Sequence, residues 1–211
     1  MNKEKRLKLI HHYIANIAVG PSTLRNHVPG VVDAARNFLA MLDLNKLKKK
    51  SVREYRKWLD KKTEKMMKTF PDGAKDDWGG ARKVLNVFMK EAYFNKELES
   101  ECNLFRLRDV LETPLDSIAA KRIRKYGKQK GIEWACKLCS EDDRESCNKR
   151  KLRCRKSAFP GIKNLKSYQS SGYQNVATEF ALDMDLPRAE IDIILWGATD
   201  EEWENILKRI A

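Results

Sequence analysis

The sequence WGGARKVLNVFMKEAYFNKEL at residues 78–98 contains the pattern that decides the fold. After a tryptophan and two glycines, its apolar residues recur three and four positions apart, which is the period of an amphipathic helix. We predict a helix from residue 81 to residue 98, preceded by a tight glycine turn, with this inner face: Val84, Leu85, Phe88, Ala92 and Tyr93. The same periodicity dominates the rest of the chain, and long strand-like alternation is absent from the sequence. The predicted fold class is therefore all-α.

The first turn of this predicted helix is basic, because Arg82 and Lys83 directly follow the glycines. Cations at a helix N-terminus are unfavourable with respect to the macrodipole. A phosphate bound by the backbone of Gly79 and Gly80 would compensate, since glycines permit a close approach and helix N-termini attract anions. We therefore predict that Trp78, Gly79, Gly80 and Arg82 contact DNA. For the tryptophan, stacking on DNA and burial in the turn both stay open.

The composition also indicates a polyanion as the partner. The chain has 211 residues, and its 43 Lys and Arg outnumber its 30 Asp and Glu, which gives a formal net charge of +13. Such a balance is typical of nucleic-acid-binding proteins, although a basic protein with evenly spread charge has the same sum. A hydrophobic content of 42% can form one substantial core. We predict one domain over residues 1–211, in a monomer.

The basic N-terminus resembles the head of a signal peptide, but its continuation does not. Apolar residues alternate with polar ones at helical spacing, as expected for an amphipathic helix rather than a targeting core: Leu7, Leu9, Ile10, Tyr13, Ile14 and Ile17. No run approaches the roughly 20 apolar residues that span a membrane. We expect a soluble, cytoplasmic protein with no membrane partner, in which cysteines are reduced.

Residues 127–160 differ in composition from the rest and are interpreted as a Cys-rich, basic insertion. The pattern Cys136-X2-Cys139-X7-Cys147-X6-Cys154 holds four of the five cysteines, and the first pair has the spacing that lets two sulfurs share one metal ion. We predict a structural zinc site, with an iron-sulfur cluster and metal-free cysteines as alternatives. Cys102 stands apart and is interpreted as a small core residue.

Capping patterns predict two further helix starts. Ser51 and Glu54 have the spacing of a capping box. Asp116 is predicted to cap, or to lie in the first turn of, a helix that continues from Ile118 to Tyr126. Basic residues follow on that helix, and we predict DNA contacts by two of them, Lys121 and Arg122.

The string Gly79-Gly80-Ala81-Arg82-Lys83-Val84-Leu85-Asn86-Val87-Phe88 resembles the junction between hairpin and helix in helix-hairpin-helix DNA glycosylases of the endonuclease III type. The segment Thr113-Pro114-Leu115-Asp116-Ser117 is similar to the one that bears the catalytic aspartate of those enzymes. The separation of 33 residues between Lys83 and Asp116, and the pair formed by Lys83 and Lys90, look most similar to the archaeal 8-oxoguanine glycosylases. A related bacterial group that acts against phages with modified bases is the second group that this sequence resembles.

This resemblance implies a helix-hairpin-helix fold and excision of a damaged or modified base that has been flipped out of the duplex. Asp116 would stabilise the positive charge that develops on the sugar. Lys83 would displace the base and form a Schiff base, with associated lyase activity, if burial or nearby cations lower its pKa. The alternatives are a solvated or phosphate-contacting Lys83 and an Asp116 that only caps its helix.

Three questions stay open in the sequence. The loop donors Arg25, Asn26 and His27 fit either base recognition or satisfaction of their own backbone. The identity of the base, and its removal in DNA repair or in antiviral defence, are not specified. The competing function is a non-catalytic nucleic-acid-binding protein with a zinc-stapled basic module.

Overall fold

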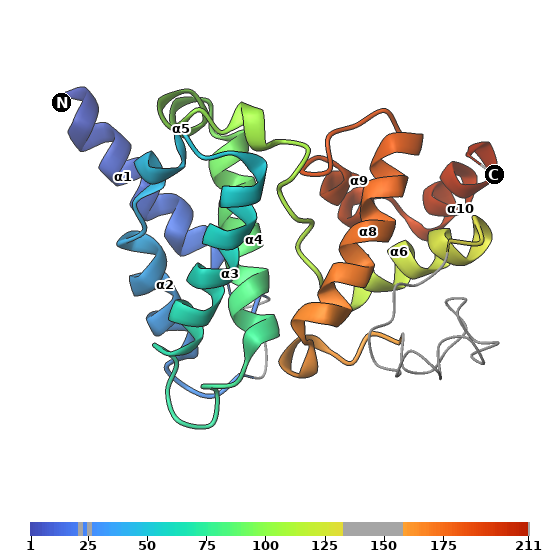
Figure 1. The fold of residues 1–211 in the computed structure, drawn as a ribbon, viewed down its shortest axis with the longest axis horizontal. Helices are drawn as coiled ribbons and strands as arrows, with labels where there is room; N and C mark the ends of the chain where they lie inside the picture. The colour runs from blue at the N-terminus through green and yellow to red at the C-terminus, as the bar shows by residue number, and fades with distance from the viewer. Residues whose placement is uncertain (21–22, 25–26, 133–157, 211) are drawn as a thin grey trace. The chain divides into compact units, whose positions relative to one another are not determined.

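The computed structural model describes residues 1–20, 23–24, 27–132 and 158–210 (Figure 1). Throughout these residues the regular elements are helices, and none is a strand, so the predicted all-α class is confirmed. None of the described helices combines the length and the apolar character that crossing a membrane requires.

The chain divides into two compact units, Met1–Pro114 and Leu115–Ala211, and each is described by itself. The sequence predicts one domain over the whole chain. The division into units does not decide whether they fold together, so this organisation stays a prediction.

Unit 1 is a group of helices around α4. Its elements are α1 (Lys3–Ala18), α2 (Val31–Ala40), η1 (Leu44–Leu47), α3 (Val52–Met67), α4 (Trp78–Phe94), α5 (Lys96–Cys102) and η2 (Phe105–Leu107). The central helix α4 packs against α1, α2, α3 and α5. The five residues predicted as its inner face are all buried: Val84, Leu85, Phe88, Ala92 and Tyr93.

The ends of α4 differ from the prediction of a helix over residues 81–98. The helix begins at Trp78, so Gly79 and Gly80 are helical residues and do not form a hairpin loop. The left-handed glycine of this junction is Gly73, whose φ of 85° few other residues adopt. At the far end Asn95 interrupts the helix, because its side chain accepts a hydrogen bond from Leu98 N at 3.1 Å and caps α5.

Two other helices of unit 1 test the sequence patterns. At the start of α3, the predicted capping box is confirmed, since the Glu54 carboxylate accepts from Ser51 N at 2.7 Å. In α1, the prediction of an amphipathic helix holds, but three of its apolar residues point to solvent: Leu9, Tyr13 and Ile17. The buried face of α1 instead contains Ile14 and small alanines, which permit close packing against α2 and α4.

Unit 2 is a smaller set of helices in which α6 packs against α8 and α9. Its elements are α6 (Ser117–Gln129), η4 (Ile162–Asn164), α8 (Ser167–Asp183), α9 (Ile191–Gly197) and α10 (Asp200–Arg209). An aromatic series joins three of these helices, because Phe180 lies between Tyr126 at 5.1 Å and Trp203 at 5.2 Å, measured between ring centroids. The Tyr126 hydroxyl donates to Asp183 Oδ2 at 2.9 Å, and burial followed by this carboxylate raises the pKa of the tyrosine.

The first turn of α4 predicts an unusual cost for a glycine-to-alanine change. A Cβ at Gly80 would lie 2.6 Å from Asp77 Oδ2, so the carboxylate that caps α4 would have to move. Gly80→Ala is expected to lower the free energy of unfolding by about 1–2 kcal/mol, the usual cost of a missing cap, although alanine normally favours a helix. Urea titration followed by circular dichroism measures it. Gly20→Ala is the control, because its Cβ would meet nothing closer than Ile17 O at 3.7 Å; an equal effect of both changes would contradict the explanation.

Candidate functional site

The N-terminus of α4 is occupied by a carboxylate of the protein itself. Asp77 is the N-cap, and its Oδ1 accepts from Gly80 N at 2.7 Å. His27 Nε2 lies 2.6 Å from Asp77 Oδ2, and both side chains are buried. The anion at this helix start is thus a carboxylate of the chain, which disfavours a second anion there. Contact of Gly79 and Gly80 with DNA stays a prediction.

Three residues are predicted to recognise a base, and His27 is the one among them that the structure describes. It lies against Asp77. Its imidazole supports the Asp77 cap and is 4% exposed. The expectation that it faces a base pocket is corrected accordingly. Arg25 and Asn26 lie outside the described residues, so their predicted role stays a prediction.

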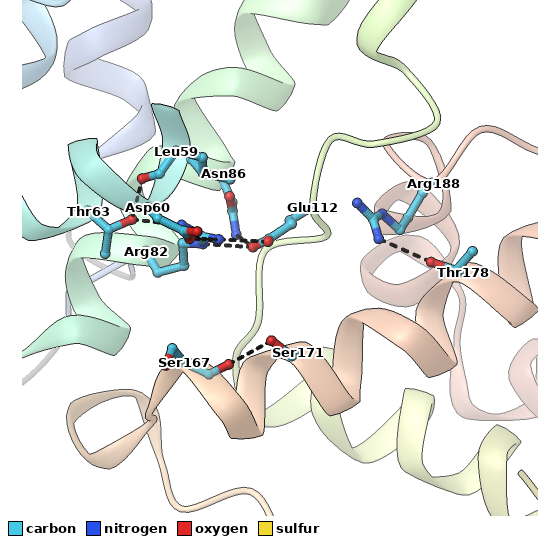
Figure 2. Close-up of polar contacts among 10 residues, drawn as sticks. All are labelled: Leu59, Asp60, Thr63, Arg82, Asn86, Glu112, Ser167, Ser171, Thr178 and Arg188. Carbon is cyan, nitrogen blue, oxygen red and sulfur yellow. Dashed lines mark hydrogen bonds and ion pairs between the residues drawn. The ribbon is translucent and has the colours of Figure 1, made fainter. Parts of the chain in front are cut away.

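Arg82 lies inside unit 1 and is held by an acid from a distant part of the chain (Figure 2). Its Nε and Nη2 donate to the two carboxylate oxygens of Glu112, each at 2.8 Å. Burial opposes the charge of the guanidinium, but the Glu112 carboxylate and then Asp60 raise its pKa above the ordinary value. Arg82 is 6% exposed, and its predicted contact with DNA stays a prediction.

Three further side chains complete this cluster. Asp60 Oδ1 lies 2.9 Å from Arg82 Nη2, and Thr63 Oγ1 accepts from Arg82 Nη1 at 3.0 Å while it donates to Leu59 O at 2.9 Å. Asn86 Nδ2 donates to Glu112 Oε2 at 3.1 Å, which fixes the orientation of its amide. The opposite atom, Asn86 Oδ1, is buried and has no hydrogen-bond donor among the described residues.

Lys83 follows Arg82 in α4 and is itself 8% exposed. Asn86 and Lys90 lie three and seven residues further along the helix, so they share a face with Lys83. Lysine is almost never this buried unless it is paired. The face of α4 that carries Lys83 thus contains a buried amine and a buried amide acceptor.

Asp116 is the N-cap of α6, as one of the two predicted placements requires. Its Oδ1 accepts from Ile118 N at 2.9 Å and from Ala119 N at 3.0 Å. The side chain is buried, with 6% of the residue exposed. Capping therefore holds this carboxylate in one orientation.

The remaining predicted DNA contacts fall into two groups. Lys121 is exposed, and Trp78 is half-buried with the Arg82 guanidinium 5.2 Å from its ring centroid. Arg122 is 8% exposed and donates to Leu195 O at 2.9 Å and to Asp200 Oδ1 at 3.1 Å. Its guanidinium caps the C-terminal part of α9, and contact of Arg122 with DNA stays a prediction.

The predicted metal ligands Cys136, Cys139, Cys147 and Cys154 lie in the segment 133–157, outside the described residues, so the zinc and iron-sulfur alternatives stay predictions. Within the described ranges, no group of three metal-ligating side chains occurs. Cys102 is buried in unit 1, as predicted, and burial raises the pKa of its thiol to about 11.

Sequence reasoning did not identify Asp77, Glu112 or Asn86. A local signal exists for Asp77, because an acid three residues before a glycine-rich helical turn is ordinary capping sequence. For Glu112 there is none, since its partner Arg82 is 30 residues away.

Comparison with protein-family models, curated proteins and solved structures finds no significant match for this chain. The resemblance to DNA glycosylases therefore depends on the quoted residues alone.

The cluster predicts that removal of the Glu112 charge is expensive. Glu112→Gln leaves the buried Arg82 without its main anion, and we expect the free energy of unfolding to fall by about 3 kcal/mol, as when one partner of a buried pair is removed. Urea titration is the measurement. Glu97→Gln is a matched control, because Glu97 pairs with Arg6 at 2.8 Å in an exposed position, where such pairs contribute about 1 kcal/mol or less. Similar decreases in both variants would contradict the importance assigned to the buried pair.

Proposed function

We propose that this protein is a DNA glycosylase that excises a damaged or modified base, with Asp116 and Lys83 as its catalytic residues. The observation that carries the proposal is the burial of Lys83 in α4, in the sequence context that resembles the lysine-bearing helix of helix-hairpin-helix glycosylases. The helix-hairpin-helix fold is part of the same proposal. The formal charge of +13 supports DNA as the partner.

The role proposed for Asp116 is electrostatic. As the bond between the sugar and the base breaks, positive charge develops at C1′ and its ring oxygen, and a fixed carboxylate stabilises that charge. The two backbone N–H groups bound to Asp116 Oδ1 hold the carboxylate in place before the reaction begins. Such preorganisation avoids reorientation during the chemical step.

The role proposed for Lys83 is nucleophilic. Its neutral amine attacks C1′, and the bond from C1′ to the base breaks with its electron pair on the base, which then takes a proton. Loss of a proton from the lysine nitrogen and opening of the sugar give a Schiff base, from which the strand can be cleaved. Burial is one of the conditions that make a lysine amine nucleophilic, and Lys83 is buried.

The target base must leave the duplex, because its glycosidic bond is inaccessible in the stack. Asn86 Oδ1, a buried acceptor on the face of α4 that carries Lys83, is the kind of group that accepts a hydrogen bond from a base edge or a sugar hydroxyl. We include it in the proposed site as a substrate-orienting residue.

Substitution of Asp116 tests the electrostatic role. Asp116→Asn keeps an efficient N-cap, so the fold is expected to remain, while base release from duplexes with a panel of modified bases falls about 100-fold or more. Chromatography of the freed base measures the rate, and thermal unfolding confirms that the cap is intact. Full base release by the folded variant would eliminate Asp116 from the reaction.

Substitution of Lys83 tests the nucleophilic role. Lys83→Gln is expected to abolish covalent trapping of the protein on DNA by borohydride, which reduces a Schiff base to a stable amine. Lys90→Gln is the control, because Lys90 lies on the same helix and pairs with Glu91 at 3.2 Å. Base release without trapping in the parent protein would make the enzyme monofunctional. Tight DNA binding without release of any base in the panel would favour the non-catalytic nucleic-acid-binding function.

A further inference from the structure

A groove of about 520 Å³ in unit 1 is lined almost entirely by lysines. They come from η1, from the segment that follows it and from α3: Lys46, Lys50, Lys57, Lys61, Lys62 and Lys65. Trp58 and Glu54 complete the lining. No part of the proposed catalytic site belongs to this groove.

Asp43 pairs with one of these lysines, Lys46, at 3.7 Å, and two other nearby acids are engaged elsewhere. Glu54 is held by the capping box, where its carboxylate accepts from Ser51 N and Oγ, each at 2.7 Å. Asp60, although it lies on α3, pairs with Arg82. Within the part of the chain that the structure describes, Lys57, Lys61 and Lys65 form no ion pair. The groove therefore carries a concentrated positive charge that nearby acids offset only in part.

The pKa of Lys62 is lowered in this groove. Burial lowers its pKa, and the positive charges of Lys65 and Lys46 lower it further. A bound anion would oppose both effects, because it stabilises the protonated amine.

Trp58 adds a neutral donor to the groove. The residue is 8% exposed, and its indole Nε1–H is buried without an acceptor among the described residues. An indole N–H can only donate, so its missing partner is an acceptor atom. Buried polar groups are normally paired, and an unpaired one requires an explanation.

The lysines also have a regular spacing. Lys57, Lys61 and Lys65 follow one another at four-residue intervals, which corresponds to about 6 Å along the helix axis for each step and about 12 Å in total. One strand of B-form DNA carries a phosphate about every 3.4 Å along its axis, so this row matches a span of three to four phosphates.

From the lysine row, the excess of positive charge and the unpaired indole, we propose that the α3 groove binds the phosphate backbone of duplex DNA. The choice of DNA rests on the proposed function. The groove supplies affinity that does not depend on the target base.

Two other macromolecules fit the groove less well. Membrane-surface helices present a broad apolar face beside their lysines, but most of the apolar residues of α3 are buried: Tyr55, Trp58, Leu59 and Met66. Protein interfaces are depleted in lysine at their centre, whereas lysine is the main lining residue here.

The test uses the full chain and a labelled duplex without any modified base, with affinity measured by fluorescence anisotropy over a range of NaCl concentrations. In the groove variant, Lys57→Gln, Lys61→Gln and Lys65→Gln are combined. The slope of log affinity against log salt is expected to become shallower by about 2 to 3, close to 0.9 for each phosphate that the variant no longer neutralises. The matched control combines Lys5→Gln, Lys96→Gln and Lys208→Gln, which remove the same charge from exposed positions outside the groove.

A groove variant with the affinity and salt slope of the matched control would overturn the proposal. The proposal would also be overturned if the groove variant no longer bound vesicles that contain phosphatidylserine but bound DNA as the matched control does. Because the duplex contains no target base, a failure of base excision leaves this result unaffected. The failures of the two proposals are therefore distinguishable.

Trp58→Phe separates the indole N–H from the lysine charges, since phenylalanine keeps an aromatic ring in the core. The affinity of the Trp58→Phe variant for the duplex is expected to fall severalfold. The slope of log affinity against log salt is expected to stay unchanged, because a neutral donor releases no counterion. An unchanged affinity in the folded variant would overturn the assignment of Trp58 to the groove.

Discussion

The buried charge pair between Arg82 and Glu112 is the constraint on which unit 1 depends. It joins α4 to the segment that follows η2, and Asp60 and Thr63 extend it to α3. Removing either charge would leave the other without its bidentate partner in a buried position, which costs far more than an exposed pair contributes. The pair also fixes the rotation of α4 about its axis. Consecutive residues of an α-helix are rotated by about 100° about its axis. Lys83 and Asn86 therefore point in fixed directions relative to the Glu112 carboxylate.

Arginine and lysine have different tasks in this chain. The guanidinium groups of three arginines donate to backbone carbonyls near the ends of helices: Arg36 to Val19 O, Arg106 to Leu47 O, and Arg122 to Leu195 O. Guanidinium is weakly hydrated and has donors in a fixed fork, so it can be buried where an ammonium group would lose more hydration. The lysines of α3 remain at the surface. The sum of charges in the sequence does not separate these two uses, and for this reason it does not reveal that Arg82 and Arg122 are buried and paired within the chain.

Local patterns in the sequence predict local structure well. The inner face of α4, the Ser51 capping box and the Asp116 N-cap each depend on spacing within a few residues, and all three are confirmed. The errors concern partners that are distant in the chain. A basic helix start indicates a missing anion, and this inference is sound, but the anions are Asp77 and Glu112 rather than a phosphate. No local rule relates Arg82 to an acid 30 positions later, and the sequence contains no mark of the face on which Leu9, Tyr13 and Ile17 point to solvent.

Carboxylates occupy the starts of α4 and α6, and this affects how these helix ends could interact with an anionic polymer. Asp77 accepts from one N–H group of α4, and Asp116 accepts from two N–H groups of α6, so each helix start already holds a carboxylate of the chain. In the proposed function, contacts with the DNA backbone would come mainly from side chains, and long, hydrated lysines suit that task because they reach a phosphate without a fixed geometry. In the two proposals, the charges that would provide affinity are distinct from the buried residues that would perform the chemistry. Affinity would then follow the ionic strength of the solution, whereas the stabilisation of charge at C1′ would depend on a carboxylate that salt screens little.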